Sequence, residues 1–401
     1  MHSRMLRFMA VSVFAMCAVA CDDQGAGLGT DPVLSAECME LAASCLENQQ
    51  VCVDGPMGAT CEACPTGYFA DHDGFCAEIR GVQHTHSFPE FTTAPGEEVS
   101  GLCRSWSLNN PEEIWVNAVE LTNSELSHHS NWTYAPNTSF EGPDGVWPCS
   151  ERGYSQLAAA ALGGVLYAQS TQATHEIQKF PEGVAIRIPP YSQIVGDIHI
   201  LNVTPETNVG NIDLVIYEIP ASEVTTRLTP FHVTVHDLDI PPRMRSRFQG
   251  ECDVTNEFAE AGSPSVDLDI YYILPHTHAL GVRFYLESFG GEGGTQQLFD
   301  IYGFNGEARG QFYSPPQRLR GIEGFRFGCE FENPRDERVG WGIGDQEMCE
   351  ALGFAASPVA FESRVTNSVM EGEDGAIETY KGTCDTLAFA WSHDRRGGQP
   401  Q

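Results

Sequence analysis

The sequence predicts an all-β protein with two antiparallel β-sandwich domains of jelly-roll-like type, preceded by a small disulfide-rich module. From residue 81 onward, short apolar or alternating segments are separated by Gly, Pro and Asn, which is typical of sandwich strands. Six cysteines crowd into the segment 38–76, where little apolar sequence is present. Only residues 156–162 and 256–261 have a helical pattern, and both segments are short.

The strand pattern is clearest in three segments, which are residues 184–188, 212–219 and 282–286. Two prolines follow the first segment and one proline follows the second, and proline ends a strand because it has no N–H to donate. The boundary between the sandwiches is expected near residues 226–242. We therefore expect an N-terminal sandwich in residues 81–229 and a C-terminal sandwich in residues 230–395.

Residues 1–20 have the features of a signal peptide. Basic residues precede an apolar run, 8–20, that is too short for a membrane-spanning helix. The run ends in Ala-Val-Ala before Cys21, which resembles a bacterial lipobox, so we expect Cys21 to be lipidated and residues 21–34 to form a tether. Ordinary signal-peptide cleavage is the alternative. We expect an exported bacterial protein, either a cell-envelope lipoprotein or a secreted one, whose only membrane contact is its N-terminal lipid.

Cysteine usage also indicates an oxidising compartment. Of the 14 cysteines, two lie in the leader, and the remaining twelve can form six disulfides. The first six resemble an EGF-like module in residues 35–80, and that resemblance implies the pairs Cys38–Cys52, Cys45–Cys61 and Cys64–Cys76. A zinc site at Cys61-x-x-Cys64 is the alternative, although the other four thiols lack a matching pair.

The charge of the chain excludes one class of partner. The sequence has 22 Lys and Arg against 55 Asp and Glu, a formal net charge of −33. Such a surface repels phosphate backbones, so we expect no nucleic-acid partner. The acidity would attract cations, copper among them, but we interpret it as a solubility feature of an exported protein.

Five of the thirteen histidines stand in strings that can hold a metal. His276 and His278 alternate on a strand, so their side chains leave the same face and can grip one ion. The adjacent pair His128 and His129 can share an ion only where the backbone is irregular, and the turn-prone residues around it favour irregularity. His199 lies in an Ile-rich strand, where a single histidine is more often structural than a ligand.

The order His-His, His, His-x-His, Met-Cys resembles the copper type II ascorbate-dependent monooxygenases, the family that hydroxylates peptidylglycine and dopamine. The strings HTHALG at 276–281 and DQEMC at 345–349 are close to that family's signatures, and the resemblance covers roughly residues 81–392. It implies two copper ions. One would be held by His128, His129 and His199, and the other, the catalytic one, by His276, His278 and Met348.

The resemblance also implies how the remaining cysteines pair. Cys103 and Cys149 flank the His-His string at family-like distances and would form one disulfide. Cys349 follows the methionine directly and would pair with Cys329, which leaves Cys252 to pair with Cys384.

The chemistry implied by the resemblance is hydroxylation of a substrate C–H bond by dioxygen. Ascorbate or a similar reductant would supply two electrons, and the three-histidine copper would pass one of them across a solvent-filled cleft. A thioether ligand favours Cu(I), which suits the copper that meets oxygen. Peptide-amidating members bind a substrate carboxylate with Arg and Tyr where this chain has Leu274 and Leu352, so an apolar or aromatic small molecule fits better than a peptide.

Two other functions compete with the enzyme. The same ligands would serve a non-catalytic surface copper-binding lipoprotein. Alternatively, the cysteine-rich module would act in adhesion, with the sandwiches as spacers. Two further histidine motifs remain: His84-x-His86 on an opening strand, and the pair His232 and His236. We interpret both motifs as structural.

Overall fold

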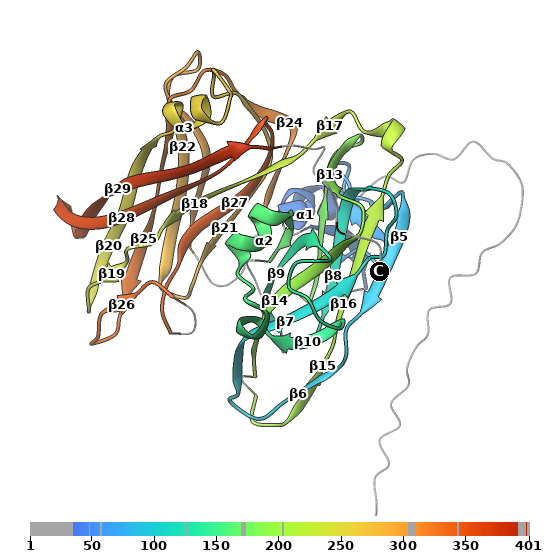
Figure 1. The fold of residues 1–401 in the computed structure, drawn as a ribbon. Coiled ribbons are helices and arrows are strands. Elements are labelled where there is room, and N and C mark those ends of the chain that lie inside the picture. The colour runs from blue at the N-terminus through green and yellow to red at the C-terminus, as the bar shows by residue number, and fades with distance from the viewer. Residues whose placement is uncertain are drawn as a thin grey trace, which may run out of the picture.

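The computed structural model describes residues 35–47, 49–56, 58–124, 127–169, 174–202, 204–303, 310–342, 345–391 and 398. The expected signal peptide, Cys21 and the tether 21–34 lie outside these residues. Strands predominate and only three α-helices occur in the described part of the chain, so the predicted all-β fold class is confirmed (Figure 1). No helix among the described residues has the length and apolarity needed to cross a membrane.

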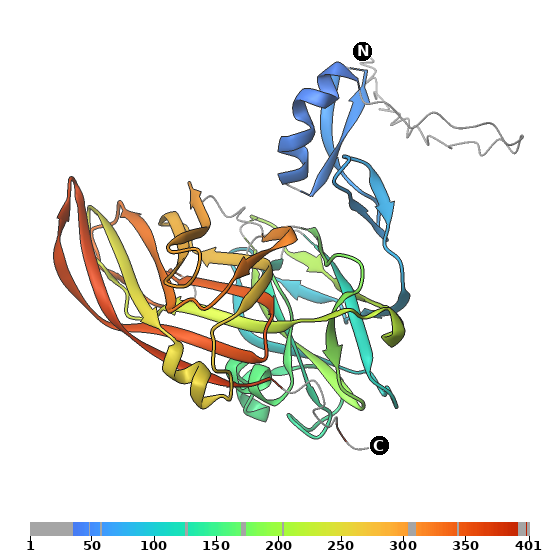
Figure 2. The same cartoon turned by 90° about the horizontal axis from the view of Figure 1, so that it is seen from above.

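The cysteine-rich module consists of one helix and two small hairpins. They are α1 (Ala36–Glu47), β1 (Gln50–Gly55) paired with β2 (Gly58–Ala63), and β3 (Tyr68–Ala70) paired with β4 (Cys76–Glu78). Its apolar cluster is built mostly from cysteines, because a segment this small buries too little other apolar surface. Figure 2 shows the helix and first hairpin standing away from the rest of the molecule.

The first β unit has two facing sheets. Five strands pair in the order β10 (Gly145–Pro148), β7 (Glu98–Ser107), β14 (Ser192–Leu201), β9 (Ser127–Pro136) and β11 (Gly164–Ala168). The other sheet has the order β17 (Thr226–Arg227), β13 (Val184–Ile188), β8 (Ile114–Asn123), β16 (Ile212–Glu218) and β5 (Val82–Ser87), with β12 (His175–Lys179) also on β8. A short pair, β6 (Phe91–Thr93) and β15 (Asn208–Gly210), and the helix α2 (Gln156–Leu162) complete the unit.

The two faces of β8 explain how the module is attached. Val119 and Leu121 point into the core between the sheets, whereas Ala118 and Glu120 point outward, as strand alternation requires. On this outer face Glu120 is buried, accepts a hydrogen bond from the backbone N–H of Gly67 at 3.1 Å, and lies 2.7 Å from His175 Nε2. The second hairpin of the module therefore packs directly on the first β unit.

The second β unit is one curved sheet around a single apolar core. Its strands follow the order β23 (Gln296–Tyr302), β22 (Gly281–Phe289), β25 (Gly324–Asn333), β20 (Met244–Asp253), β29 (Ile377–Ala390), β28 (Val359–Asp374), β18 (Thr229–Val235), β27 (Cys349–Ala356), β21 (Leu268–Thr277) and β24 (Gln311–Leu319). The pairs β18–β28 and β20–β29 are parallel and the others antiparallel. The pair β19 (Asp239–Ile240) and β26 (Val339–Gly340) and the helix α3 (Thr255–Glu260) lie outside this path.

The two β units share a core where they meet. Tyr272 and Phe354 of the second unit belong to the same buried cluster as Phe180 of the first, and the ring centroids of Phe180 and Phe354 are 5.6 Å apart. The chain passes from one set of sheets to the other between Arg227 and Thr229. Because aromatic side chains bury large apolar areas, this contact holds the units in a defined arrangement.

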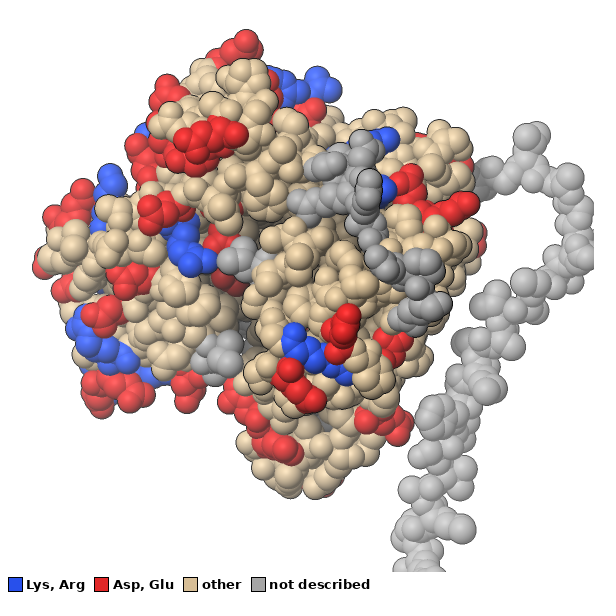
Figure 3. Space-filling view, viewed as in Figure 1, with Lys and Arg blue, Asp and Glu red and all other residues tan. Residues whose placement is uncertain are grey.

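All six expected disulfides are present, and they join the pairs implied by the two resemblances: Cys38–Cys52, Cys45–Cys61, Cys64–Cys76, Cys103–Cys149, Cys252–Cys384 and Cys329–Cys349. Disulfides of this number form in an oxidising compartment. Figure 3 shows acidic side chains spread over both β units, in keeping with the excess of Asp and Glu.

Candidate metal centre

The first set of candidate ligands lies on the neighbouring strands β9 and β14. His199 pairs with His129, but the next pair is Ile200 with Ser127, so His128 is the extra residue of a bulge. A bulge redirects the side chains at the point where it interrupts the ladder. The irregular backbone expected for the His-His string is therefore present. The side chain of His128 lies outside the described part of the structure.

A glycine keeps these two strands in close register. Gly196 lies opposite Trp132, whose ring is fully buried. A Cβ atom at Gly196 would lie 2.5 Å from Trp132 Cζ3, closer than side chains tolerate. The Gly of the string around His199 and the Trp of the string around His129 therefore fit together, and they fix the relative position of the two histidines.

The two imidazoles face each other across the strands. His199 Nδ1 lies 3.3 Å from His129 Nε2. Two nitrogens bound at about 2.0 Å to one tetrahedral ion lie about 3.3 Å apart, so this spacing suits joint ligation. On its other side, His199 Nε2 donates to Glu98 on β7 at 2.8 Å, which fixes the tautomer and leaves Nδ1 as the ligand atom.

The second set lies at the end of β21. His276 is the penultimate residue of the strand and His278 begins the turn that follows. His278 Nδ1 donates to the backbone carbonyl of Gln346 at 2.7 Å, whereas its Nε2 is buried with no hydrogen-bond partner. Burying a nitrogen without a partner costs free energy, and a bound metal ion would remove that cost. His278 thus has the arrangement of a metal ligand oriented by a carbonyl.

A buried carboxylate holds the turn that carries His278. Glu347 is 1% exposed, and its two oxygens accept the backbone N–H groups of His278 at 2.8 Å and Leu280 at 2.7 Å. Burial raises the pKa of Glu347 to about 7, although these N–H groups act in the opposite direction. Glu347 therefore ties the turn after β21 to the segment that carries the methionine.

Met348 follows Glu347 and is nearly buried, with 9% of its surface exposed. Thr277 pairs with Cys349 and His276 with Glu350. The paired ladder ends there, so Met348 lies one residue before β27 begins and His278 lies one residue after β21 ends. The disulfide from Cys349 to Cys329 anchors the strand beside it.

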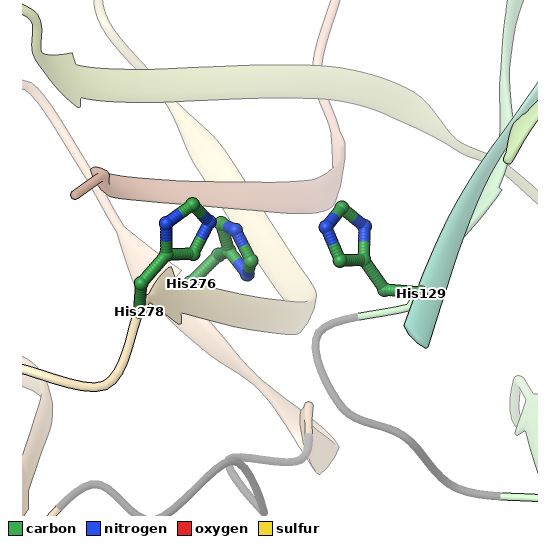
Figure 4. A group of neighbouring side chains, drawn as sticks. All are labelled: His129, His276 and His278. Atoms are coloured by element: carbon green, nitrogen blue, oxygen red, sulfur yellow. The ribbon is translucent and has the colours of Figure 1, made fainter. Parts of the chain in front are cut away.

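The structure brings the two sets together rather than placing them across a solvent-filled cleft, which corrects that expectation. The ring centroid of His129 lies 5.2 Å from that of His276 and 6.5 Å from that of His278. In Figure 4, His129 reaches from the first β unit toward the two histidines of the second. One ligand atom from each of the three residues lies within 4.8 Å of the others. The reason is the apolar contact between the units, which brings the ends of β9 and β21 together.

A group of charged residues beside His276 was not found from the sequence, and its nearest member, Glu350, is the cross-strand partner of His276. Glu350 is close enough to act electrostatically on His276 and His278, and its oxygen lies 3.5 Å from His232 Nε2. The other nitrogen of His232 lies 3.7 Å from Glu362. Burial lowers the pKa of His232, but the two carboxylates outweigh it and raise that pKa to about 9. The interpretation of His232 as structural agrees with this ion-pair geometry.

The remaining singled-out residues make contacts with groups other than the candidate ligands. His84 Nε2 lies 2.7 Å from Glu218, and His86 stacks on Trp106 with ring centroids 5.0 Å apart. Leu274 and Leu352 are a directly opposed pair on β21 and β27. Both pack in the cluster shared by the two β units, so they help to position the units.

Comparison with known proteins does not assign this chain to a family. No family profile and no curated protein matches this chain. Among solved structures, PBCV-1 VP54 fitted into a cryo-EM reconstruction of the virophage Sputnik matches with a TM-score of 0.26 and 8% identity, covering 69% of this chain and 94% of that one. An infectious bursal disease virus VP2 subviral particle matches with a TM-score of 0.18 and 9% identity, covering 69% and 72%. Scores this low carry no argument about function.

Proposed function

We propose that this chain is an exported lipoprotein with copper-dependent monooxygenase activity, hydroxylating a substrate C–H bond with dioxygen and two electrons from ascorbate or a similar reductant. The observation that carries the proposal is that candidate ligands from distant parts of the sequence lie close together. Four of the expected ligands, from strands far apart in the sequence, lie together between the two β units: His129, His199, His276 and His278. Met348 directly precedes β27, the strand that pairs with the one carrying His276.

The donor set fits copper. Imidazole nitrogens and a thioether sulfur suit copper, whereas calcium and magnesium require oxygen ligands. The nearby carboxylates are already engaged, since Glu98 accepts from His199, Glu347 from the backbone, and Glu350 faces His232. The atom aimed into the centre without a partner is a nitrogen, His278 Nε2.

The residues of the chain prepare the centre by orienting its ligands. Glu98 keeps the proton of His199 on Nε2, and the carbonyl of Gln346 keeps the proton of His278 on Nδ1, so each ring presents a lone pair to the centre. Bound copper would supply the one-electron and oxygen chemistry that amino-acid side chains lack. The apolar contact between the units limits the access of water from that side.

One observation favours the alternative, a non-catalytic copper-binding lipoprotein. The hollow beside His276, lined by Pro275 and Phe284 among others, has room for about one water molecule. A protein that only captures copper needs no larger space.

Copper content and oxygen consumption of the purified protein separate these functions. For the enzyme we expect two copper ions per chain and ascorbate-dependent oxygen uptake, measured by metal analysis and an oxygen electrode. Met348→Ala should abolish the uptake, whereas Met370→Ala, at a side chain 49% exposed on β28, should not change it. Two coppers without oxygen uptake would identify the copper-binding alternative, and a protein that binds no copper would exclude both.

A further inference from the structure

We infer that His129, His276 and His278 form a single metal site that joins the two β units. This inference deepens the proposed function, and it rests on the metal-binding part of that function alone. It assigns His129 to an ion shared with the second unit, whereas the family resemblance assigns it to a separate ion in the first unit.

The distances between the three residues are close to those of a bound state. Two nitrogens held at about 2.0–2.1 Å by one tetrahedral ion lie about 3.3 Å apart. The ligand atoms of the three histidines lie within 4.8 Å of one another, so side-chain rotations that shorten these distances by at most about 1.5 Å would bring them to one ion. The ring centroids of His276 and His278 are 5.0 Å apart, and their planes are nearly perpendicular, at 82°.

The site is prepared on the side of the second unit. His278 Nε2 is buried without a partner, and Nδ1 of the same ring is held by the carbonyl of Gln346. Glu350, the cross-strand partner of His276, provides negative charge that favours a cation there. Three neutral imidazoles with a carboxylate nearby suit a transition-metal ion such as Cu(I) or Zn(II).

The approach of His129 follows from how the units pack. Phe180 contacts Tyr272, Phe312 and Phe354 across the boundary, with ring centroids 6.4, 6.3 and 5.6 Å apart. Because this contact is buried and aromatic, it fixes the distance between β9 and β21 and so holds His129 beside His276. An ion bound by all three residues would stabilise this arrangement further, since it binds only when the units are in contact.

Titration with zinc tests the shared site, because zinc has no redox chemistry and its binding is read independently of oxygen uptake. The complete metal-free chain is titrated with Zn²⁺, and the affinity of the tightest site is measured by competition with a chelator, alongside the rise in Tm. If the site is shared, His129→Ala and His276→Ala should each weaken the tightest site by at least about 10-fold. His72→Ala, at a side chain that is 90% exposed on the module, should leave its affinity unchanged.

The opposite pattern would overturn the inference. If His129 belongs only with His199, His276→Ala will weaken the site that contains His276, whereas His129→Ala will leave the affinity of that site unchanged. His129→Gln, which retains a side chain of similar size, repeats the measurement if His129→Ala lowers the Tm of the metal-free protein. Absence of oxygen uptake would contradict the proposed enzyme activity but not the shared zinc site. The failure of the activity and the failure of the shared site are therefore distinguishable.

Discussion

The two sets of histidines are held in place by different means. In the first β unit, a strand bulge and the carboxylate of Glu98 orient His129 and His199, and the Glu98 side chain is 43% exposed. In the second unit, the buried carboxylate of Glu347, a backbone carbonyl and a disulfide position His278 and its neighbours. The second set is therefore fixed by groups withdrawn from water, whereas the first is fixed partly by a solvated one.

This difference indicates which ligand side chains are already held in position in the metal-free protein. Hydrogen bonds from buried groups persist because water does not compete for them, whereas an exposed carboxylate exchanges its partners with solvent. We expect the second set to be rigid without metal and the first set to be ordered by metal binding. Three predictions test this contrast.

The largest effect is expected from the disulfide beside Met348. The double variant Cys329→Ala/Cys349→Ala opens a covalent loop with a sequence separation of 20. Loss of a loop of this length lowers the free energy of unfolding by about 3 kcal/mol, because the unfolded chain regains entropy. Chemical denaturation measures the change, and copper analysis should show that the second set has lost its ion.

The matched control is Cys38→Ala/Cys52→Ala in the module, where the sequence separation is 14. Its loop is of similar size but distant from the ligands, so copper content should stay at the wild-type level. Equal copper loss in both double variants would show that the disulfide beside Met348 has no special role in the centre.

A medium effect is expected from Glu347, and Glu98 provides the direct comparison. In Glu347→Gln, one of the two backbone N–H groups, of His278 or Leu280, loses its acceptor. An unsatisfied buried donor costs about 1–3 kcal/mol, which denaturation would measure. In Glu98→Gln the amide oxygen can still accept from His199, and the partner is exposed to solvent, so the cost should stay below about 1 kcal/mol.

Glu337→Gln, at an exposed side chain on the same loop region, is the control for the loss of one negative charge. The proposed rigidity of the second set requires Glu347→Gln to be the most destabilising of the three variants. If Glu98→Gln costs as much as Glu347→Gln, the contrast between the two sets is wrong.

The third effect is a pH dependence caused by His232, and solvent screening reduces it because the side chain is 30% exposed. The carboxylates of Glu350 and Glu362 raise its folded pKa to about 9 from 6.5. A histidine with a raised folded pKa stabilises the fold fully below its unfolded pKa and loses that contribution as pH rises through the folded value. The free energy of unfolding should therefore fall between about pH 6.5 and 9 in the wild type.

His232→Gln removes the titrating group, so its unfolding free energy should fall less over the same range. The difference between the two proteins isolates His232 from every other group that titrates. A constant difference across the range would mean that the ion pairs do not form.

Much of the fold followed from the sequence because local patterns determine strands. The segment 184–188, ended by two prolines, is a strand with those bounds, and the turn-prone residues around His128 mark a bulge. Cysteine positions were equally informative, since the two resemblances that they carry implied all six pairs.

The supporting carboxylates had no such signal. Glu98 reaches His199 from a strand about a hundred residues earlier, and a single glutamate is not distinctive in a chain with 55 acidic residues. Glu347 stood within a recognised string, but its role depends on a turn that closes over it. The nearness of His129 to His276 depends on the packing of two units, which no local pattern encodes.

The hydrogen bond from the Gly67 N–H to the buried Glu120 fixes the position of the second hairpin of the module on the first β unit. The second hairpin of the module packs on the outer face of β8, so this part of the module does not move independently of the first β unit. The disulfides Cys38–Cys52 and Cys45–Cys61 join α1 to the first hairpin, whereas the attachment to the first β unit is made by the second hairpin.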